Sequence, residues 1–170
     1  MRKTMLVAAC LVAGASVAAF AGPKEGTIEV GGTSVGGFST LLAKGGGSAF
    51  ALDAIGGYYL MPEVELKGIV SFEKAKGQDS QYTIMAGADY VFAGSDPWVP
   101  YAGGGFGFIN GYDDKGKTET KFAGQIHGGV HYFFNDSVSA NGEVNYKFQF
   151  SHIGDGVLSM GVGLSVYFGL

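Results

Sequence analysis

The chain has 170 residues, including 31 glycines, 4 prolines and 1 cysteine, and its formal net charge is −4 at pH 7. This length suits one domain, and abundant glycine with scarce proline and 14% aromatic residues favours close-packed strands over disorder. With only 11 basic residues, the acidic balance argues against a nucleic-acid-binding protein, which needs clustered basic side chains.

Residues 1–21 have the pattern of a secretory signal peptide. Arg2 and Lys3 are followed by an apolar run from Met5 to about Phe20, and residues 19–21 (Ala-Phe-Ala) fit a cleavage site. We therefore expect this leader to be removed on export, leaving residues 22–170 as the mature domain. That domain has 9 basic residues, all lysine, against 15 acidic ones, so its formal charge is −6.

Two other interpretations of the N-terminus stay open. The apolar run could anchor the chain in a membrane, although it is a little short and ends in small residues. Residues 7–10 (Val-Ala-Ala-Cys) resemble a lipid-attachment box, although Cys10 comes early, with little apolar sequence before it. If the leader is cleaved, the mature domain has no cysteine, and therefore neither a disulfide nor a thiolate metal site.

The rest of the chain alternates large apolar side chains with small or polar ones, a period of two that predicts β-strands. Eight such segments span residues 27–38, 48–60, 63–72, 81–92, 98–109, 119–134, 138–148 and 157–170. Each is long enough to cross a bilayer as a tilted strand, which takes about 9–11 residues. The last segment carries its apolar face to the final residue, as expected if it pairs back onto the first and closes a barrel.

The connections and the aromatic residues indicate which face of these strands meets lipid. Short turns alternate with longer, more polar loops, which is the pattern of outer-membrane barrels. Aromatic side chains gather near both ends of the strands, with aliphatic and small residues between them, as in the two aromatic girdles of a membrane barrel. A soluble barrel with its apolar face inward is the alternative. The segment 98–109 is so rich in glycine that its facing is ambiguous; we expect Val99, Tyr101 and Ile109 to point outward.

These features together resemble the small eight-stranded outer-membrane β-barrel family of Gram-negative bacteria, the OmpA/OmpX-like barrels. The resemblance rests on the eight alternating strands, on Pro100-Tyr101 with the following Gly103–Gly105, and on the C-terminal Gly163, Val166 and Phe168. It implies an all-β, eight-stranded antiparallel up-and-down transmembrane β-barrel in the bacterial outer membrane. It also implies lipid as a partner and insertion by the barrel-assembly machinery, which recognises the C-terminal strand.

The family includes structural barrels, adhesins and a few lipid-modifying enzymes, so the search for chemistry matters. Members that trim lipid A use a His-x-Ser pair with an acidic residue. None of the three histidines has this pattern: His127 is followed by two glycines, His131 is followed by Tyr-Phe, and Ser151 comes before His152 instead of after it. His127 and His131 are also about 13 Å apart along a strand, too far for one metal ion. We expect no catalytic, cofactor or metal site.

The polar residues on the predicted inner face are instead expected to fill the barrel, because eight strands leave just enough room for side chains. This lumen plug comprises Lys67, Asp89, Asn141, Glu143, His127 and His131. Lys67 and Asp89 should meet across a hairpin, and Asn141 and Glu143 should reach the same layer, placing the lysine between two carboxylates.

The expected function is therefore that of an integral outer-membrane barrel with a structural or surface-interaction role and no catalysis of its own. The alternatives are a barrel that binds or passes a small ligand and, third, an enzyme that modifies lipid A. The best candidate for a surface contact is the loop 110–118, with Asp113, Asp114, Lys115 and Lys117. Nothing in the residues identifies the surface partner or the oligomeric state.

Overall fold

The computed structural model describes residues 22–36, 49–75, 80–92, 97–112, 118–150 and 152–169. The predicted signal peptide and the loop residues Asp113, Asp114, Lys115 and Lys117 lie outside these ranges. The eight strands are β1 (Ile28–Gly36), β2 (Ala49–Met61), β3 (Val64–Ala75), β4 (Gln81–Val91), β5 (Trp98–Tyr112), β6 (Thr118–Asn135), β7 (Val138–Gln149) and β8 (His152–Phe168). None of the described residues forms a helix that is long and apolar enough to cross a membrane.

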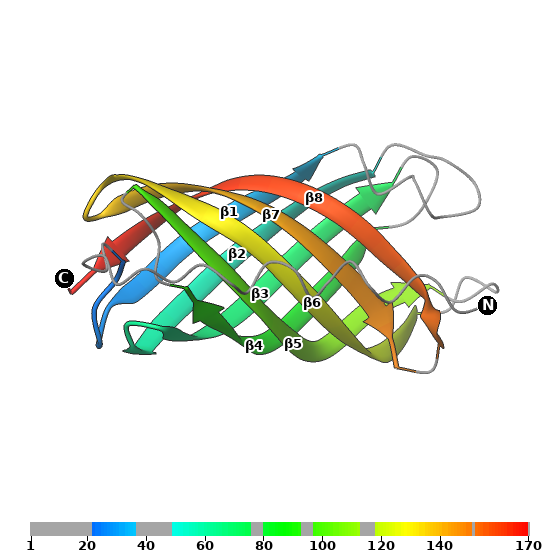
Figure 1. The fold of residues 1–170 in the computed structure, drawn as a ribbon. Coiled ribbons are helices and arrows are strands. Elements are labelled where there is room, and N and C mark those ends of the chain that lie inside the picture. Colours follow the sequence, from blue (N-terminus) through cyan, green and yellow to red (C-terminus); the bar gives the residue numbers. More distant parts are fainter. Residues whose placement is uncertain are drawn as a thin grey trace, which may run out of the picture.

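The strands form one closed antiparallel barrel in chain order, which confirms the predicted fold class. Each strand pairs with its neighbours in sequence, and β1 lies beside β8 (Figure 1). The register of β1 and β8 runs from Ile28↔Phe168 to Val35↔Gly161. This pairing joins the two ends of the sheet, so the described strands have no open sheet edge where β1 meets β8. Several boundaries differ from the prediction: β8 begins at His152 instead of residue 157, and β3 and β5 run three residues further than predicted, to Ala75 and Tyr112.

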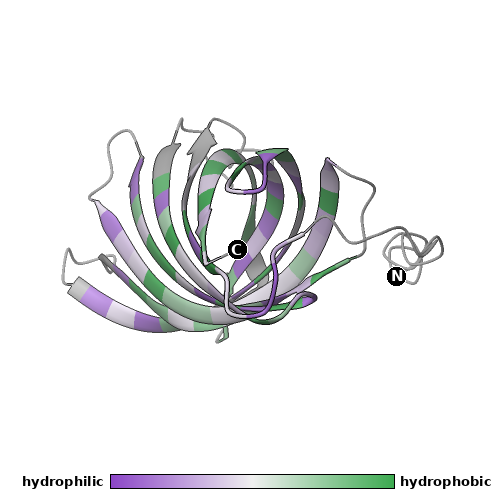
Figure 2. Cartoon of the chain, turned by 90° about the vertical axis from the view of Figure 1, so that its left-hand side faces the viewer, coloured by the Kyte–Doolittle hydropathy of each residue, from purple (hydrophilic) through white to green (hydrophobic). Residues whose placement is uncertain are grey.

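The wall of the barrel has an apolar outer face and a polar inner face. Along β4, Ile84 is 63% exposed on the outside, whereas its neighbour Thr83 is 2% exposed and faces the interior. Every strand carries at least one large, exposed apolar side chain, and hydropathy alternates along the strands (Figure 2). An apolar surface that surrounds the whole molecule is stable against lipid and not against water.

Aromatic rings gather on the outer face near both ends of the strands. At the end with the short turns, Trp98 packs edge-on against Tyr132 with ring centroids 4.7 Å apart. At the opposite end, Phe122 stacks on Phe150 at 4.8 Å. These two groups match the girdles that place aromatic side chains at the two interfaces of a bilayer.

The facing predicted for β5 is wrong. Val99 and Tyr101 are buried inside the barrel, and Ile109 packs against an inner apolar cluster, while Trp98 and Phe106 are exposed on the outside. The register explains how the large Tyr101 ring fits, because its partner on β6 is Gly129. A Cβ atom at that glycine would lie 2.7 Å from the tyrosine oxygen, so the missing side chain provides the space for the ring.

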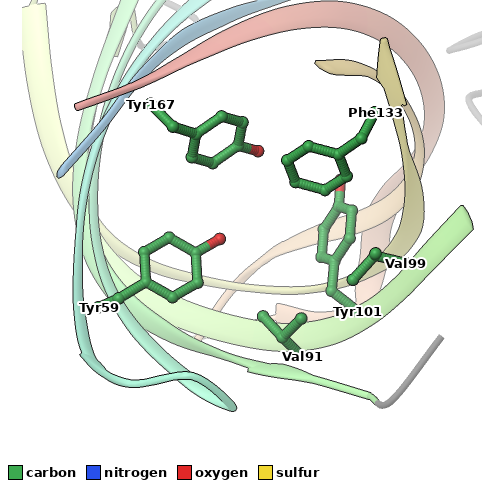
Figure 3. Packing of buried hydrophobic residues seen from close by; sticks show 6 residues of the cluster. All are labelled: Tyr59, Val91, Val99, Tyr101, Phe133 and Tyr167. Atoms are coloured by element: carbon green, nitrogen blue, oxygen red, sulfur yellow. The ribbon is translucent and has the colours of Figure 1, made fainter. Parts of the chain in front are cut away.

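Two apolar clusters fill the interior on either side of a charged centre. The first, near the short turns, contains Tyr59, Val91, Val99, Tyr101, Phe133 and Tyr167 (Figure 3). The second lies further along the strands and contains Ile69, Met85 and Ala123. The inward residues between them on β3, β4 and β6 are mostly polar, and they form the charged centre.

Candidate functional site

The charged centre is built around Lys67 of β3, which is buried in the interior. Its Nζ atom lies 2.6 Å from Oδ2 of Asp89 and 3.4 Å from Oε2 of Glu65. The same atom lies 5.1 Å from the centre of the Tyr101 ring, close enough for a cation–π contact. The register of the β3–β4 hairpin pairs Glu65 directly with Asp89, so Lys67 reaches Asp89 diagonally across the inner face.

Asp89 holds a second partner with its other oxygen. Its Oδ1 atom lies 2.7 Å from Nε2 of His127, and Nδ1 of the same ring lies 3.2 Å from the Gln125 side-chain nitrogen. The amide donates to Nδ1, so the proton of a neutral imidazole is on Nε2 and is donated to Asp89. Asp89 therefore accepts a hydrogen bond on each oxygen. From its place on β4 it bonds to Lys67 on β3 and, across β5, to His127 on β6.

Asn141 and Glu143 do not join this layer as predicted. Glu143 accepts a hydrogen bond from the Tyr101 hydroxyl at 3.0 Å and another from Asn145 at 3.3 Å. The Tyr101 ring thus connects Lys67 to Glu143 and replaces the direct contact that was expected. The second carboxylate beside the lysine is Glu65, which follows from its place two residues before Lys67 on the same face.

Asn141 and His131 lie in separate parts of the interior. Asn141 contacts the hydroxyls of Thr33, at 3.5 Å, and Ser165, at 3.4 Å. Nδ1 of His131 lies 3.2 Å from both the Ser139 hydroxyl and the Tyr167 hydroxyl, and its ring stacks on Tyr101 at 4.5 Å. The two imidazoles thus bind different partners, one in the charged centre and one beside the aromatic cluster.

The sequence prediction omitted several members of the network. Glu29 of β1 is fully buried and accepts hydrogen bonds from Ser165 at 2.6 Å and from Tyr59 at 3.4 Å. Its position between the outward Ile28 and Val30 already placed it on the inner face, so the period of two could have identified it. The hydroxyls of the three buried tyrosines, in contrast, could be assigned only once the facing and register were known.

Glycines next to these carboxylates make the charged centre sterically possible. A Cβ atom at Gly57 would lie 2.7 Å from the carboxyl carbon of Glu65, and one at Gly103 would lie 2.8 Å from that of Asp89. Real side chains do not approach so closely, so Gly57 must stay glycine unless the Glu65 carboxylate moves. At Gly103 the same Cβ would also lie 2.4 Å from the backbone oxygen of Ala88, so movement of the Asp89 carboxylate alone would not make room. These two glycines therefore accommodate buried carboxylates in a narrow lumen.

Comparison with known proteins identifies the family. A family profile described as "Outer membrane protein beta-barrel domain" matches residues 7–168. Comparison with curated proteins found no match.

Solved structures of similar shape agree with this assignment. The N-terminal β-barrel domain of Pseudomonas aeruginosa OprF is similar with a TM-score of 0.67 and 17% identity, over 86% of this chain and 100% of that one. Neisserial surface protein A is similar with a TM-score of 0.62 and 18% identity, over 84% and 96% of the two chains. OprG of Pseudomonas aeruginosa has a TM-score of 0.56 and 16% identity, over 89% and 100%. These similarities concern the fold, and with the family match they point to the bacterial outer membrane: the chain belongs to the outer membrane protein β-barrel family.

Proposed function

We propose that this protein is an integral outer-membrane barrel whose interior is closed by its own side chains and which has a structural or surface-interaction role. The observation that carries the proposal is the network of Lys67 with Asp89, Glu65 and His127, which lies across the middle of the lumen. Apolar clusters lie on both sides of it along the strands.

The energetics of the interior favour a closed barrel. A buried charge is stable when it is paired and hydrogen-bonded, and separating a buried pair typically costs about 3–5 kcal/mol. A path for ions through the centre would require Lys67 to leave Asp89, its partner at 2.6 Å. We therefore expect no steady conductance from the unmodified protein.

Planar-bilayer recording tests the closed interior. The wild-type protein should give no stable single-channel currents, whereas a double variant, Lys67→Ala with Asp89→Ala, should conduct because it removes the ion pair that closes the centre of the lumen. Heat-modifiable migration on a gel checks that both proteins are folded. Stable currents from the folded wild type would instead favour the alternative in which the barrel passes a small solute.

We also propose that the barrel has no catalysis of its own. The described residues do contain a serine–histidine contact, Ser139 with His131, but both side chains are buried in the lumen. No acid is hydrogen-bonded to the second nitrogen of that ring within the described part of the chain. A lipid substrate has no access to such a pair, and a nucleophile also needs an oriented base. A lipid A mass spectrum that changes with expression of the protein would contradict this proposal.

The expected partners are outer-membrane lipid and the barrel-assembly machinery. Val166 and Phe168 of β8 are exposed on the outer face, where either partner can reach them. A surface partner would meet the loop 110–118, and we propose Asp113, Asp114, Lys115 and Lys117 as its contacts. Replacing residues 113–117 with glycine and serine should abolish such binding while leaving gel migration unchanged; unchanged binding would eliminate the loop as the contact.

A further inference from the structure

The buried charges of the lumen do not balance. Glu29, Glu65 and Asp89 are 0%, 1% and 2% exposed, and Lys67 is the one lysine that forms ion pairs with any of them among the described residues. His127 is neutral when its single proton lies on Nε2, which leaves two negative charges in excess. Even a protonated His127 would leave one. An uncompensated charge in a dry interior is costly, so a further positive charge is required.

The hydrogen bonds identify which carboxyl group lacks compensation. Asp89 receives donors on both oxygens, from Lys67 and His127, and Glu29 receives them from Tyr59 and Ser165. Glu65, in contrast, meets Lys67 at 3.4 Å through Oε2 only. Its Oε1 atom is fully buried, and no donor of the described residues reaches it.

Glu29 lies next to that orphaned oxygen. Glu29 is the register partner of Gly57 on β2, and Glu65 lies on β3 at the other side of that strand. The position that a Gly57 Cβ would take is 3.2 Å from Cβ of Glu29 and 2.7 Å from the carboxyl carbon of Glu65. Two ionised carboxylates can only accept hydrogen bonds and repel each other, whereas one proton between them makes the first group a donor to the second.

We propose that Glu29 and Glu65 form a binding site for one proton, which is held on Oε1 of Glu65 and donated to the Glu29 carboxylate. The proton supplies the missing donor, removes the like-charge contact and lowers the excess charge of the lumen. A metal ion fits less well, because no group of three His, Cys, Asp or Glu side chains converges as ligands within the described ranges. The site concerns the interior alone and holds whether or not the protein has a surface partner.

The site predicts how stability depends on pH. Glutamates of the unfolded chain are ionised above about pH 4.3, so near neutral pH the folded state binds one proton more than the unfolded state. Stability should then fall as pH rises, by about tenfold in the folding equilibrium constant per pH unit while the folded state keeps the proton. The other titratable groups that face the pair from the surrounding strands are Tyr59, Lys67, Asp89, Tyr101, His127, His131, Glu143 and Tyr167.

Infrared spectroscopy of the folded barrel in detergent or lipid tests the site directly. The wild type should show the C=O stretch of a protonated carboxyl group at neutral pH, shifted in D₂O, and both Glu65→Gln and Glu29→Gln should lose it. Each variant keeps the shape of the side chain, and heat-modifiable migration confirms folding. Absence of the band in the wild type, or its survival in both variants, would overturn the proposal. Loss of the band in Glu65→Gln alone would show that Glu65 holds the proton without Glu29 and would overturn the two-residue site.

Two controls distinguish a proton on this pair from titration elsewhere in the lumen and from a bound cation. Urea unfolding at several pH values should show the tenfold dependence in the wild type but not in Glu65→Gln, which isolates the pair from the histidines and tyrosines. The band should be the same in sodium, potassium and choline chloride. A band that disappears when a small cation is added would show that the cation, not a proton, occupies the pair. Bilayer conductance is a separate measurement, so failure of this site and failure of the closed-barrel proposal are distinguishable.

Discussion

Tyr58 and Tyr59 are neighbours on β2, yet the first is 46% exposed on the outer face and the second is 0% exposed in the interior. Tyr58 needs no specific partner, because its surroundings are lipid, whereas the Tyr59 hydroxyl bonds to Glu29. The same contrast is repeated around the barrel. The outer face depends on hydrophobicity and tolerates changes of shape, while the inner face depends on the pairing and exact volume of each polar side chain.

The strongest test of the inner face is loss of its central cation. Lys67→Met should destabilise the folded barrel by about 3–5 kcal/mol, because it leaves Asp89 and Glu65 buried without their lysine. Lys117→Met, in the predicted outer loop, should change stability little. Urea unfolding followed by gel migration measures both variants. Equal losses of stability would mean that the buried Lys67 contributes no more to folding than the loop residue Lys117.

A charge placed on the outer face should cost nearly as much. Val144→Lys puts a lysine against lipid and should destabilise the barrel by about 2–4 kcal/mol if Val144 lies at mid-bilayer. Asn145→Lys, one residue along, faces the lumen beside Glu143 and should be tolerated better. The comparison uses insertion yield into vesicles and the urea midpoint. If the two variants were equally damaged, the assignment of faces would fail.

An added methyl group distinguishes the two faces by volume instead of charge. Gly103→Ala should cost about 1–3 kcal/mol, because its Cβ would lie 2.4 Å from the backbone oxygen of Ala88 and 2.8 Å from the Asp89 carboxyl carbon. Gly56→Ala, on the outer face with nothing within 4 Å, is the matched control and should be close to neutral. Thermal unfolding of the two variants side by side provides the measurement; a neutral Gly103→Ala would show that both the Asp89 carboxylate and the backbone at Ala88 have room to move.

The smallest expected difference comes from a single oxygen atom. Tyr59→Phe removes the hydroxyl that donates to Glu29 at 3.4 Å, and should cost about 1 kcal/mol. Tyr58→Phe, its neighbour on the outer face, should cost less than half of that. Paired urea titrations can resolve such a difference, and the reverse order would contradict the inward assignment of Tyr59.

The period of two was sufficient to predict the strands, the closure and most facings, because large apolar residues alternate with small or polar ones on most of the strands. It failed on β5, where Gly103, Gly105 and Gly107 point inward while Ala102 and Gly104 point outward, so both faces look alike. There the position of Tyr101 depends on the space beside Gly129, which is a property of the pairing register and not of β5 itself.

The charged centre was predictable within a hairpin and not across the barrel. Lys67 and Asp89 belong to adjacent strands joined by a hairpin connection, so counting along the two strands placed them together, and the structure shows their ion pair. Glu143 is four strands away from Lys67, and its height relative to the lysine depends on the tilt and stagger of all strands between them. Glu143 therefore ends on the Tyr101 hydroxyl, while Glu65 takes the position beside the lysine.

The pairing of β1 with β8 also constrains the order in which the protein folds. Ile28 and Phe168 are register partners although almost the whole chain separates them, so this seam cannot form until the last strand has been made. Hairpins of neighbouring strands are local and quick to form. Pairing β1 with β8, in contrast, closes the longest loop, so it has the largest entropy cost and joins the residues that are furthest apart in the sequence. Until the seam closes, β1 and β8 each have an edge of unpaired backbone N–H and C=O groups next to an apolar outer face, which makes the incomplete barrel prone to aggregation. We therefore expect shielding of these two strands to be the step at which assembly of this barrel depends most on assistance.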